Sequence, residues 1–275
     1  MSDLFEEIVR MRRAGARGAL ATIVHTNGSI PSYESSRMLV REDGSIAWTI
    51  GGGCVEADVW AAAKEVMQKE VPRKMVFNLN HEASYDSGLI CGGTLEIFVE
   101  PILPQPVVCL FGGGHVSIAV ANAASAAGFG IEVVDDREAF ANMQRFPMAQ
   151  AVHTSYAEAF EKIRPNASSY LIIVTRGHKE DMRVLAWAVR TEARYVGMIG
   201  SKRKVLSVYK ALENEGYRAE EFARVYAPMG LDIGALSPEE IAVSVVAELI
   251  AVRRHAGVAA HKKLNYEARA ALSER

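Results

Sequence analysis

Residues 107–137 read VVCLFGGGHVSIAVANAASAAGFGIEVVDDR, and this stretch decides the fold. The apolar run at 107–111 predicts a buried strand, the glycine loop after it opens an alanine-rich helix, and residues 131–135 predict a second strand that ends in an acid. Strand, glycine loop, helix, strand and acid follow one another as they do in a βαβ dinucleotide-binding unit. The sequence therefore predicts a crevice for a nucleotide-like ligand.

The glycine loop of this unit suits an anionic ligand. Gly112 permits a tight turn, Gly114 lets the backbone approach a phosphate, and the small Ser117 stands where a third glycine allows close helix-sheet packing. The N–H groups and the positive dipole end of the helix then face the anion. Asp135 can accept hydrogen bonds from ribose hydroxyls, and His115 can bind a ligand, donate a proton or be an ordinary loop residue. The candidate ligand-binding residues here are Gly112, Gly113, Gly114, His115 and Asp135.

The composition is that of a globular protein of ordinary polarity. The 275 residues are 49% hydrophobic and 23% charged, which allows one large or two ordinary domains with real cores. A net charge of −2 argues against a general nucleic-acid or membrane surface. Three cysteines are too few for a disulfide framework, and the acidic N-terminus lacks the basic and apolar regions of a signal peptide. We therefore expect a cytoplasmic protein without nucleic-acid or membrane partners.

Closely spaced prolines mark a candidate linker. Pro101, Pro104 and Pro106 cannot continue a helix or a central strand, so we place the domain boundary among them. The expected parts of the chain are an α+β domain at 1–103, a Rossmann-like domain at 104–260 and a charged C-terminal tail at 261–275.

Hydrophobic periodicity and turn signals predict the elements of both domains. In the first domain we expect helices at 3–13 and 55–68 and strands at 18–26, 37–41, 46–50 and 94–100. In the second, strands at 107–111, 131–134, 150–153, 170–175, 195–199 and 224–227 alternate with helices. Such alternation implies right-handed crossovers and a mainly parallel sheet. The predicted fold class is α/β: a C-terminal Rossmann-like doubly wound parallel sheet preceded by a smaller α+β domain.

Ligands of open α/β sheets bind beyond the carboxyl ends of the strands, where four loops are expected. These loops cover 112–117, 135–137, 175–178 and 200–204. In the last of them three consecutive cations stand in the first turn of a helix, where they oppose the macrodipole unless an anion is near. The alternative is that these cations, and the polar residues of the 175–178 loop, point into water. The candidate contacts in these two loops are Arg176, His178, Ser201, Lys202 and Arg203.

Two of the three cysteines are embedded in glycine. Cys54 follows three glycines at the start of an expected helix, where the dipole favours a thiolate, and Cys91 precedes two glycines. Each can be a ligand contact or a packed residue, whereas Cys109 reads as a buried strand residue. Zinc is not expected, because the sequence lacks CxxC and HExxH motifs.

Several segments together resemble the XdhC/CoxI family, accessory factors for xanthine dehydrogenase and related molybdenum hydroxylases. The resemblance runs from about residue 5 to 256. Members of that family have an XdhC/CoxI domain followed by a Rossmann domain, which agrees with the boundary placed above. The segments are GSIP at 28–31, IGGGCVE at 50–56, CGGTLE at 91–96, the 112–117 loop, VDDR at 134–137, YVGMIGSKR at 195–203 and APMGLDIG at 227–234.

The resemblance implies a molybdenum cofactor chaperone. Such a protein holds the molybdopterin form of the cofactor while a cysteine desulfurase supplies a terminal sulfido ligand, and inserts it into apo xanthine dehydrogenase or a related molybdenum hydroxylase. This role needs binding more than turnover, so no catalytic residue is assigned. Glycine loops and cations suit the phosphate, and Cys54 and Cys91 are then contacts for molybdenum or sulfur.

Two other functions stay open at this stage. The glycine loop and Asp135 alone would also suit an NAD(P)-dependent oxidoreductase or a nucleotide-sensing regulatory protein. The segment SYESSR at 32–37 departs from the family pattern, which often has a small glycine-containing stretch there, so the client enzyme can differ. We also expect a homodimer.

Overall fold

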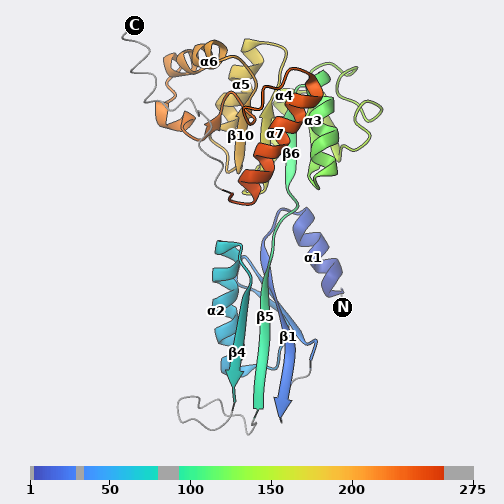
Figure 1. Ribbon diagram of the computed structural model, residues 1–275, viewed down its shortest axis with the longest axis vertical. Helices are drawn as coiled ribbons and strands as arrows, with labels where there is room; N and C mark the ends of the chain where they lie inside the picture. The colour runs from blue at the N-terminus through green and yellow to red at the C-terminus, as the bar shows by residue number, and fades with distance from the viewer. Residues whose placement is uncertain (1–2, 29–33, 80–92, 257–275) are drawn as a thin grey trace. The chain divides into compact units, whose positions relative to one another are not determined.

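The computed structural model describes residues 3–28, 34–79 and 93–256. The chain divides into two compact units, Met1–Gln105 and Pro106–Arg275 (Figure 1). Each unit has its own sheet and its own buried core. The expected charged tail at 261–275 lies outside the described residues.

The first unit is a five-stranded antiparallel sheet with a long helix, α2 (Gly53–Lys69), against one face. Val55, Val59 and Val66 of this helix belong to one core with buried side chains of the sheet, such as Ile23 and Ile97. The strands, in spatial order, are β3 (Ile46–Trp48), β2 (Arg37–Arg41), β1 (Gly18–Gly28), β5 (Gly93–Ile102) and β4 (Arg73–Asn78).

The strand β5 extends further than predicted. Its residues alternate between buried and half-buried, as the sequence pattern indicates, but Pro101 stays in register opposite Ala19 of β1 instead of ending the strand. Because β4 begins opposite Val99, the last part of β5 has a ladder partner on one side only, and a residue without an N–H is tolerated there. The expected linker is therefore shorter than the proline pattern suggests.

The strand β4 is missing from the predicted elements. It lies at the edge of the sheet, and Phe77 is its only buried residue, while Val76 is exposed. An edge strand of this kind has little hydrophobic alternation, so its sequence carries a weak signal.

Polar contacts fix the helix α1 (Leu4–Arg13) at its start and on one face. It begins at Asp3, whose carboxylate accepts a hydrogen bond from the Phe5 N–H at 2.7 Å. On its inner face Glu7 is buried, and one carboxylate oxygen lies 3.0 Å from an Arg41 guanidinium nitrogen of β2. The buried charge is thus paired, as burial requires.

The second unit is a six-stranded sheet in which every described pair of strands is parallel. Numbered by their order in this unit, the strands lie 3-2-1-4-5-6, the order of the doubly wound dinucleotide-binding fold. The fold class predicted from the sequence is therefore confirmed. In spatial order the strands are β8 (Ala151–His153), β7 (Gly130–Val134), β6 (Val107–Phe111), β9 (Ser169–Ile173), β10 (Tyr195–Met198) and β11 (Val225–Tyr226).

Helices cover both faces of this sheet, as parallel strands require. One core contains residues of α3 (His115–Ala126) and α7 (Pro238–Arg253), and the other contains residues of α4 (Tyr156–Lys162), α5 (His178–Ala188) and α6 (Lys202–Asn214). A short 3-10 helix, η1 (Ala219–Phe222), precedes β11. Ser237 and Glu240 form the capping box that begins α7, and Pro238 follows at the first helical position.

Candidate functional site

The candidate site is the edge of the parallel sheet where the strands end. The strand order reverses between β6 and β9, and the doubly wound fold binds its ligands in the crevice at such a switch point, between the loops that follow the two strands. The loop after β6 begins at Gly112, and the loop after β9 begins at Val174. These are two of the four loops expected from the sequence.

The three glycines after β6 have different structural roles. Gly112 has φ of +118°, and a Cβ atom there would lie 2.3 Å from the Val174 carbonyl oxygen. A Cβ atom on Gly113 would lie 2.1 Å from the Phe140 carbonyl oxygen. Gly114 has an ordinary φ of −72°, and nothing lies within 4 Å of a Cβ atom built there. Packing therefore requires the first two glycines, whereas Gly114 faces open space in which a ligand can approach the backbone.

The start of α3 lies directly beyond Gly114. Gly114 is the N-cap residue and provides no side-chain hydrogen bond to the first N–H groups of the helix. His115 is exposed at the first helical position, and Ser117 is fully buried, with its hydroxyl donating to the Gly112 carbonyl at 2.5 Å. Free N–H groups at a helix start attract anions, so the loop offers an anion a place at Gly114.

Asp135, at the end of β7, is buried and bonded within the protein. Its side chain is 2% exposed. One carboxylate oxygen accepts from the Gly113 N–H at 2.8 Å, and the Arg137 guanidinium donates to both oxygens at 2.8 Å. Burial raises the pKa of Asp135, but the hydrogen bonds from Arg137 and Gly113 outweigh it and hold the pKa below its usual value. A hydrogen bond from Asp135 to a ligand hydroxyl, as expected from the sequence, would require displacement of one of these donors.

Two arginines of the segment after β7 were not among the predicted site residues. Arg137 stacks its guanidinium 3.7 Å from the centre of the Phe140 ring. Arg145 donates from Nε to the Gly113 carbonyl at 3.0 Å and lies 5.0 Å from the centre of the same ring. Arg137 directly follows the acidic pair of the fingerprint, which is a signal for it. No sequence signal marks Arg145, because it contacts the glycine loop at Gly113, which lies 32 residues earlier in the sequence.

The loop after β9 contains one buried and two exposed candidate groups. Thr175 donates from its hydroxyl to the fully buried Asp181 at 2.7 Å. Arg176 is exposed, with a guanidinium nitrogen 3.9 Å from an oxygen of Asp136, and His178 is exposed at the first position of α5. Asp181 and Thr175 were not predicted as site residues.

The three cations at the start of α6 do not behave alike. Lys202 and Arg203 are exposed, as is the N-cap residue Ser201. Lys204 turns inward, and its ammonium lies 2.5 Å from an Asp181 carboxylate oxygen. Two cations therefore stay available to an anion at the helix start, and the third is neutralised inside the protein.

In the first unit, Cys54 lies in a glycine loop at one end of the sheet. Residues 51–53 all have positive φ, and nothing lies within 4 Å of a Cβ atom built on Gly52. Cys54 is the second residue of α2 and is exposed. Glu56 fixes the loop by accepting hydrogen bonds from the Ile50 N–H at 3.1 Å and from the Thr49 hydroxyl. The loop thus presents an exposed thiol from a turn that Glu56 holds by hydrogen bonds.

Cys91 lies outside the described residues, but its flanks are placed. β4 ends at Asn78, β5 begins at Gly93, and the register sets Gly93 opposite Gly28 at the end of β1. In Figure 1, β4 runs downward from the end of α2, so the start of α2 lies at the same end of the sheet as Asn78 and Gly93. Cys54, the end of β4 and the start of β5 are therefore at one end of this unit.

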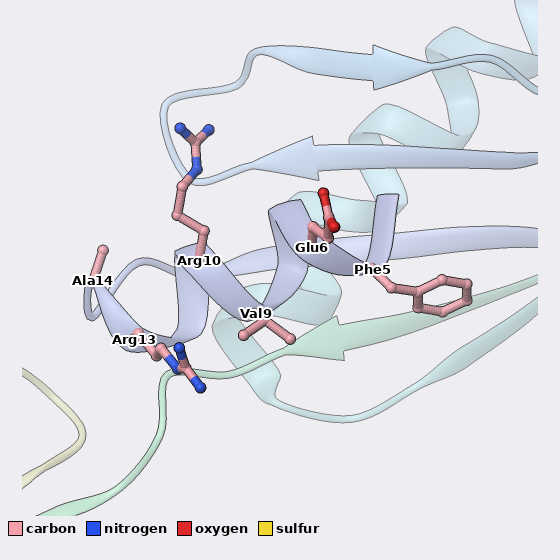
Figure 2. Close-up of a pocket in the computed structure, with 6 residues that line it drawn as sticks. All are labelled: Phe5, Glu6, Val9, Arg10, Arg13 and Ala14. Atoms are coloured by element: carbon pink, nitrogen blue, oxygen red, sulfur yellow. The ribbon is translucent and has the colours of Figure 1, made fainter. Parts of the chain in front are cut away.

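A separate shallow pocket lies along α1 (Figure 2). It is lined by the apolar Phe5 and Val9 and by the charged Glu6, Arg10 and Arg13, with Ala14 at the end of the helix. None of these residues was predicted to bind a ligand. All of its lining comes from one helix, so it lacks the convergent polar groups of a small-molecule site.

The described residues contain neither a metal-binding cluster nor a membrane-spanning helix. Within ranges 3–28, 34–79 and 93–256, His, Cys, Asp and Glu side chains do not form a cluster of three that could hold a metal ion. Over the same ranges, no helix is long and apolar enough to cross a membrane.

Family models match both parts of the chain. The model described as the XdhC Rossmann domain matches residues 108–249, and the model of the XdhC and CoxI family matches residues 11–78. These ranges contain the Gly112 loop and the Cys54 loop respectively.

Three curated proteins are similar in sequence. The uncharacterized protein YqeB of Escherichia coli is 33% identical over 92% of this chain and 47% of its own length. A probable xanthine dehydrogenase subunit of Bacillus subtilis is 32% identical over 60% of this chain and 48% of its own length. The chain thus spans about half the length of these two relatives. The molybdenum cofactor insertion chaperone PaoD of Escherichia coli is 24% identical over 88% of this chain and 85% of its own length.

One solved structure has the same fold over nearly the whole chain. The crystal structure of a xanthine dehydrogenase from Bacillus halodurans is similar with a TM-score of 0.51 and 24% identity, and the match covers 94% of this chain and 98% of that one. At this identity the likeness concerns the fold.

Proposed function

The chain belongs to the XdhC and CoxI family, and we propose that it is an accessory protein that binds the molybdenum cofactor in its molybdopterin form. In this proposal it holds the cofactor while a cysteine desulfurase provides the terminal sulfido ligand. It then delivers the cofactor to apo xanthine dehydrogenase or a related molybdenum hydroxylase. The names of two relatives, a molybdenum cofactor insertion chaperone and a probable xanthine dehydrogenase subunit, support this reading.

The Cys54 loop is the observation that carries the proposal. An exposed thiol follows three glycines of positive φ, beside open space at Gly52, and Glu56 holds the loop in place. A soft thiolate is a ligand that suits molybdenum or a transferred sulfur atom. We include Cys91 in the same proposal because its flanks lie at the same end of the sheet as Cys54.

The crevice of the second unit suits a phosphate group. The packing around position 114 would tolerate a side chain, so it does not itself require a glycine there. The N–H groups at the start of α3 receive no hydrogen bond from a capping side chain. Arg176, Lys202 and Arg203 are exposed at the same edge of the sheet. We assign these residues, with His115, His178 and Ser201, to ligand contact within the second unit.

This role asks the chain to bind, orient and release, and we assign no catalytic residue. The cofactor supplies the chemistry that the client enzyme later uses. This protein contributes an exposed thiol, the backbone N–H groups at the start of α3 and exposed cations, all of which act by contact.

Delivery to a client tests the proposal. The full chain, produced without oxygen in cells that make the cofactor, would be mixed with apo xanthine dehydrogenase, and the gain of hydroxylase activity followed with time. We expect activation by the wild-type chain and reduced activation by Cys54→Ser. Cys109→Ala is the matched control, because that thiol is buried in β6. Equal activation by the wild type and Cys54→Ser would contradict a role for the thiol.

A dinucleotide-dependent oxidoreductase is the second candidate. Strand order 3-2-1-4-5-6 and the glycine loop favour it. The bonding of Asp135 within the protein opposes it, because that carboxylate is the group expected to receive a ribose.

A further inference from the structure

We infer that Arg137 is a specificity-determining residue, which keeps the ribose diol of a dinucleotide out of the crevice by occupying Asp135. The inference concerns what the second unit excludes, so it stands apart from the proposed molybdopterin ligand.

The acceptor capacity of Asp135 is filled from inside the protein. A carboxylate offers about four lone-pair directions. Asp135 uses four donors: the Gly113 N–H at 2.8 Å, the Arg137 N–H at 3.0 Å, and the Arg137 Nε and Nη2 at 2.8 Å each. With 2% of the side chain exposed, no face of the carboxylate is left for ribose hydroxyls.

Arg137 is itself held in place. The Cζ atom of its guanidinium lies over the Phe140 ring, 3.7 Å from the ring centre, and only 29% of the Arg137 side chain is exposed. The Phe140 backbone is packed against Gly113, where a Cβ atom would be 2.1 Å from the Phe140 carbonyl oxygen. Arg137 therefore cannot swing away without disturbing the segment that covers the glycine loop.

Both backbone polar groups of Gly113 are hydrogen-bonded to side chains of the protein. The Gly113 N–H donates to Asp135, and the Gly113 carbonyl accepts from Arg145 Nε at 3.0 Å. In the dinucleotide-binding fold the acid after the second strand is free to bind the ribose. Here the acid is a support for the loop, and the open part of the crevice begins one residue later, at Gly114.

A ligand of this crevice is therefore recognised by an anionic group at Gly114 and not by a ribose diol at Asp135. A dinucleotide that entered would have to break hydrogen bonds between two charged groups, the Arg137 guanidinium and the Asp135 carboxylate. It would gain bonds in which only the carboxylate is charged, and these lack the attraction between opposite charges. The geometry points to Arg137 as the residue whose removal would change this preference.

Titration of the full chain with NADH and NADPH, followed by nucleotide fluorescence, tests the inference. We expect neither to bind the wild type at concentrations up to about 1 mM, the weak end of ordinary ligand affinities. Arg137→Met should free two directions of the Asp135 carboxylate and make NADH binding measurable, at least tenfold tighter than in the wild type. The double variant Arg137→Met with Asp135→Asn should lose that gain.

Arg145→Met is the matched control. It removes one positive charge and one hydrogen bond from the same loop, yet leaves all four donors of Asp135 in place. It should not gain NADH affinity. An equal gain in Arg145→Met, or no gain in a folded Arg137→Met, would overturn the role of Arg137.

The wild-type titration can overturn the inference even where Arg137→Met fails to fold. Submillimolar binding of NADH by the wild type, reduced at least tenfold in Asp135→Asn, would show that Asp135 receives a ribose and would overturn the inference. These outcomes are separate from the proposed function, since neither one concerns Cys54 or molybdopterin.

Discussion

The ammonium of Lys204 lies 2.5 Å from the carboxylate of Asp181, a residue with no solvent exposure. Lys204 belongs to the first turn of α6 and Asp181 to the first turn of α5, so the pair joins the starts of two helices at the carboxyl edge of the sheet. Thr175 adds a hydrogen bond of 2.7 Å from the loop after β9. Buried polar contacts thus connect the loop after β9 to the starts of α5 and α6, next to the exposed residues of the candidate site.

Loss of Lys204 should destabilise the protein. Lys204→Met leaves the buried Asp181 carboxylate without its cation, and removal of one partner of a buried ion pair costs about 3–5 kcal/mol. Urea unfolding would measure the free energy of unfolding. Lys202→Met is the matched control, because Lys202 is exposed, and it should change stability by no more than about 0.5 kcal/mol. Equal stability of the two variants would show that the pair contributes nothing.

Asp135 should make stability depend on pH in the acid range. Its pKa is lowered in the folded protein, so the unfolded chain binds the proton more readily. The stabilisation is fully present above the unfolded value, about 3.9, and is lost as pH falls through the folded value. Asp135→Asn should therefore unfold with a smaller pH dependence below about pH 4 than the wild type. Asp136→Asn, an exposed neighbour, should retain the wild-type dependence.

Gly112 and Gly114 should respond differently to a side chain. Gly112→Ala forces a Cβ atom to within 2.3 Å of a backbone oxygen at a φ of +118° and should cost about 1–3 kcal/mol of stability or more. Gly114→Val meets open space at an ordinary φ, so stability should fall by no more than about 1 kcal/mol, the scale of an N-cap change. Ligand retention should fall sharply in Gly114→Val. A Gly114→Val protein that is stable and binds normally would show that the ligand does not approach this backbone.

The exposed cations of α6 should contribute to binding and not to stability. Lys202→Gln with Arg203→Gln removes two charges that oppose the helix dipole, so the free energy of unfolding should stay level or rise by a few tenths of a kcal/mol. Binding of molybdopterin should weaken and its salt dependence should flatten, as calorimetric titration at low and high salt would measure. Unchanged affinity and unchanged salt dependence would mean that both side chains point only into water.

Much of the fold is predictable because its signals are local. The run at 107–111, the glycine loop and the strand at 131–134 lie within about thirty residues, and the capping box at Ser237 fixes the start of α7. β4 is not predictable in this way, since an edge strand with a single buried residue has no clear period. Pro101 falsely predicts the end of β5 for a related reason. The strand tolerates a proline there because β4 does not extend far enough to pair with it, and the sequence does not show where β4 begins.

The site is predictable in its location but not in its partners. Parallel strands place their following loops at one edge, so the sequence order alone brings Gly112, Arg176 and Lys202 to that edge. Which charges are then free is decided by side-chain pairing across the fold. Arg137 neutralises Asp135, and Asp181 withdraws Lys204 from a row of three apparently equivalent cations. No spacing rule distinguishes Lys204 from its neighbours before the starts of α5 and α6 are set side by side.

Identification of the bound ligand tests the central claim most directly. The full-length wild type, Cys54→Ser and Cys109→Ala would be purified without oxygen from cells that make the cofactor, and the ligand released from each analysed by mass spectrometry together with its molybdenum content. We expect the wild type and Cys109→Ala to carry molybdopterin with molybdenum, and Cys54→Ser to carry at least tenfold less while unfolding at the same urea concentration. A wild-type protein that releases a nicotinamide dinucleotide in place of molybdopterin, or that carries no more molybdopterin than Cys54→Ser, would contradict the account.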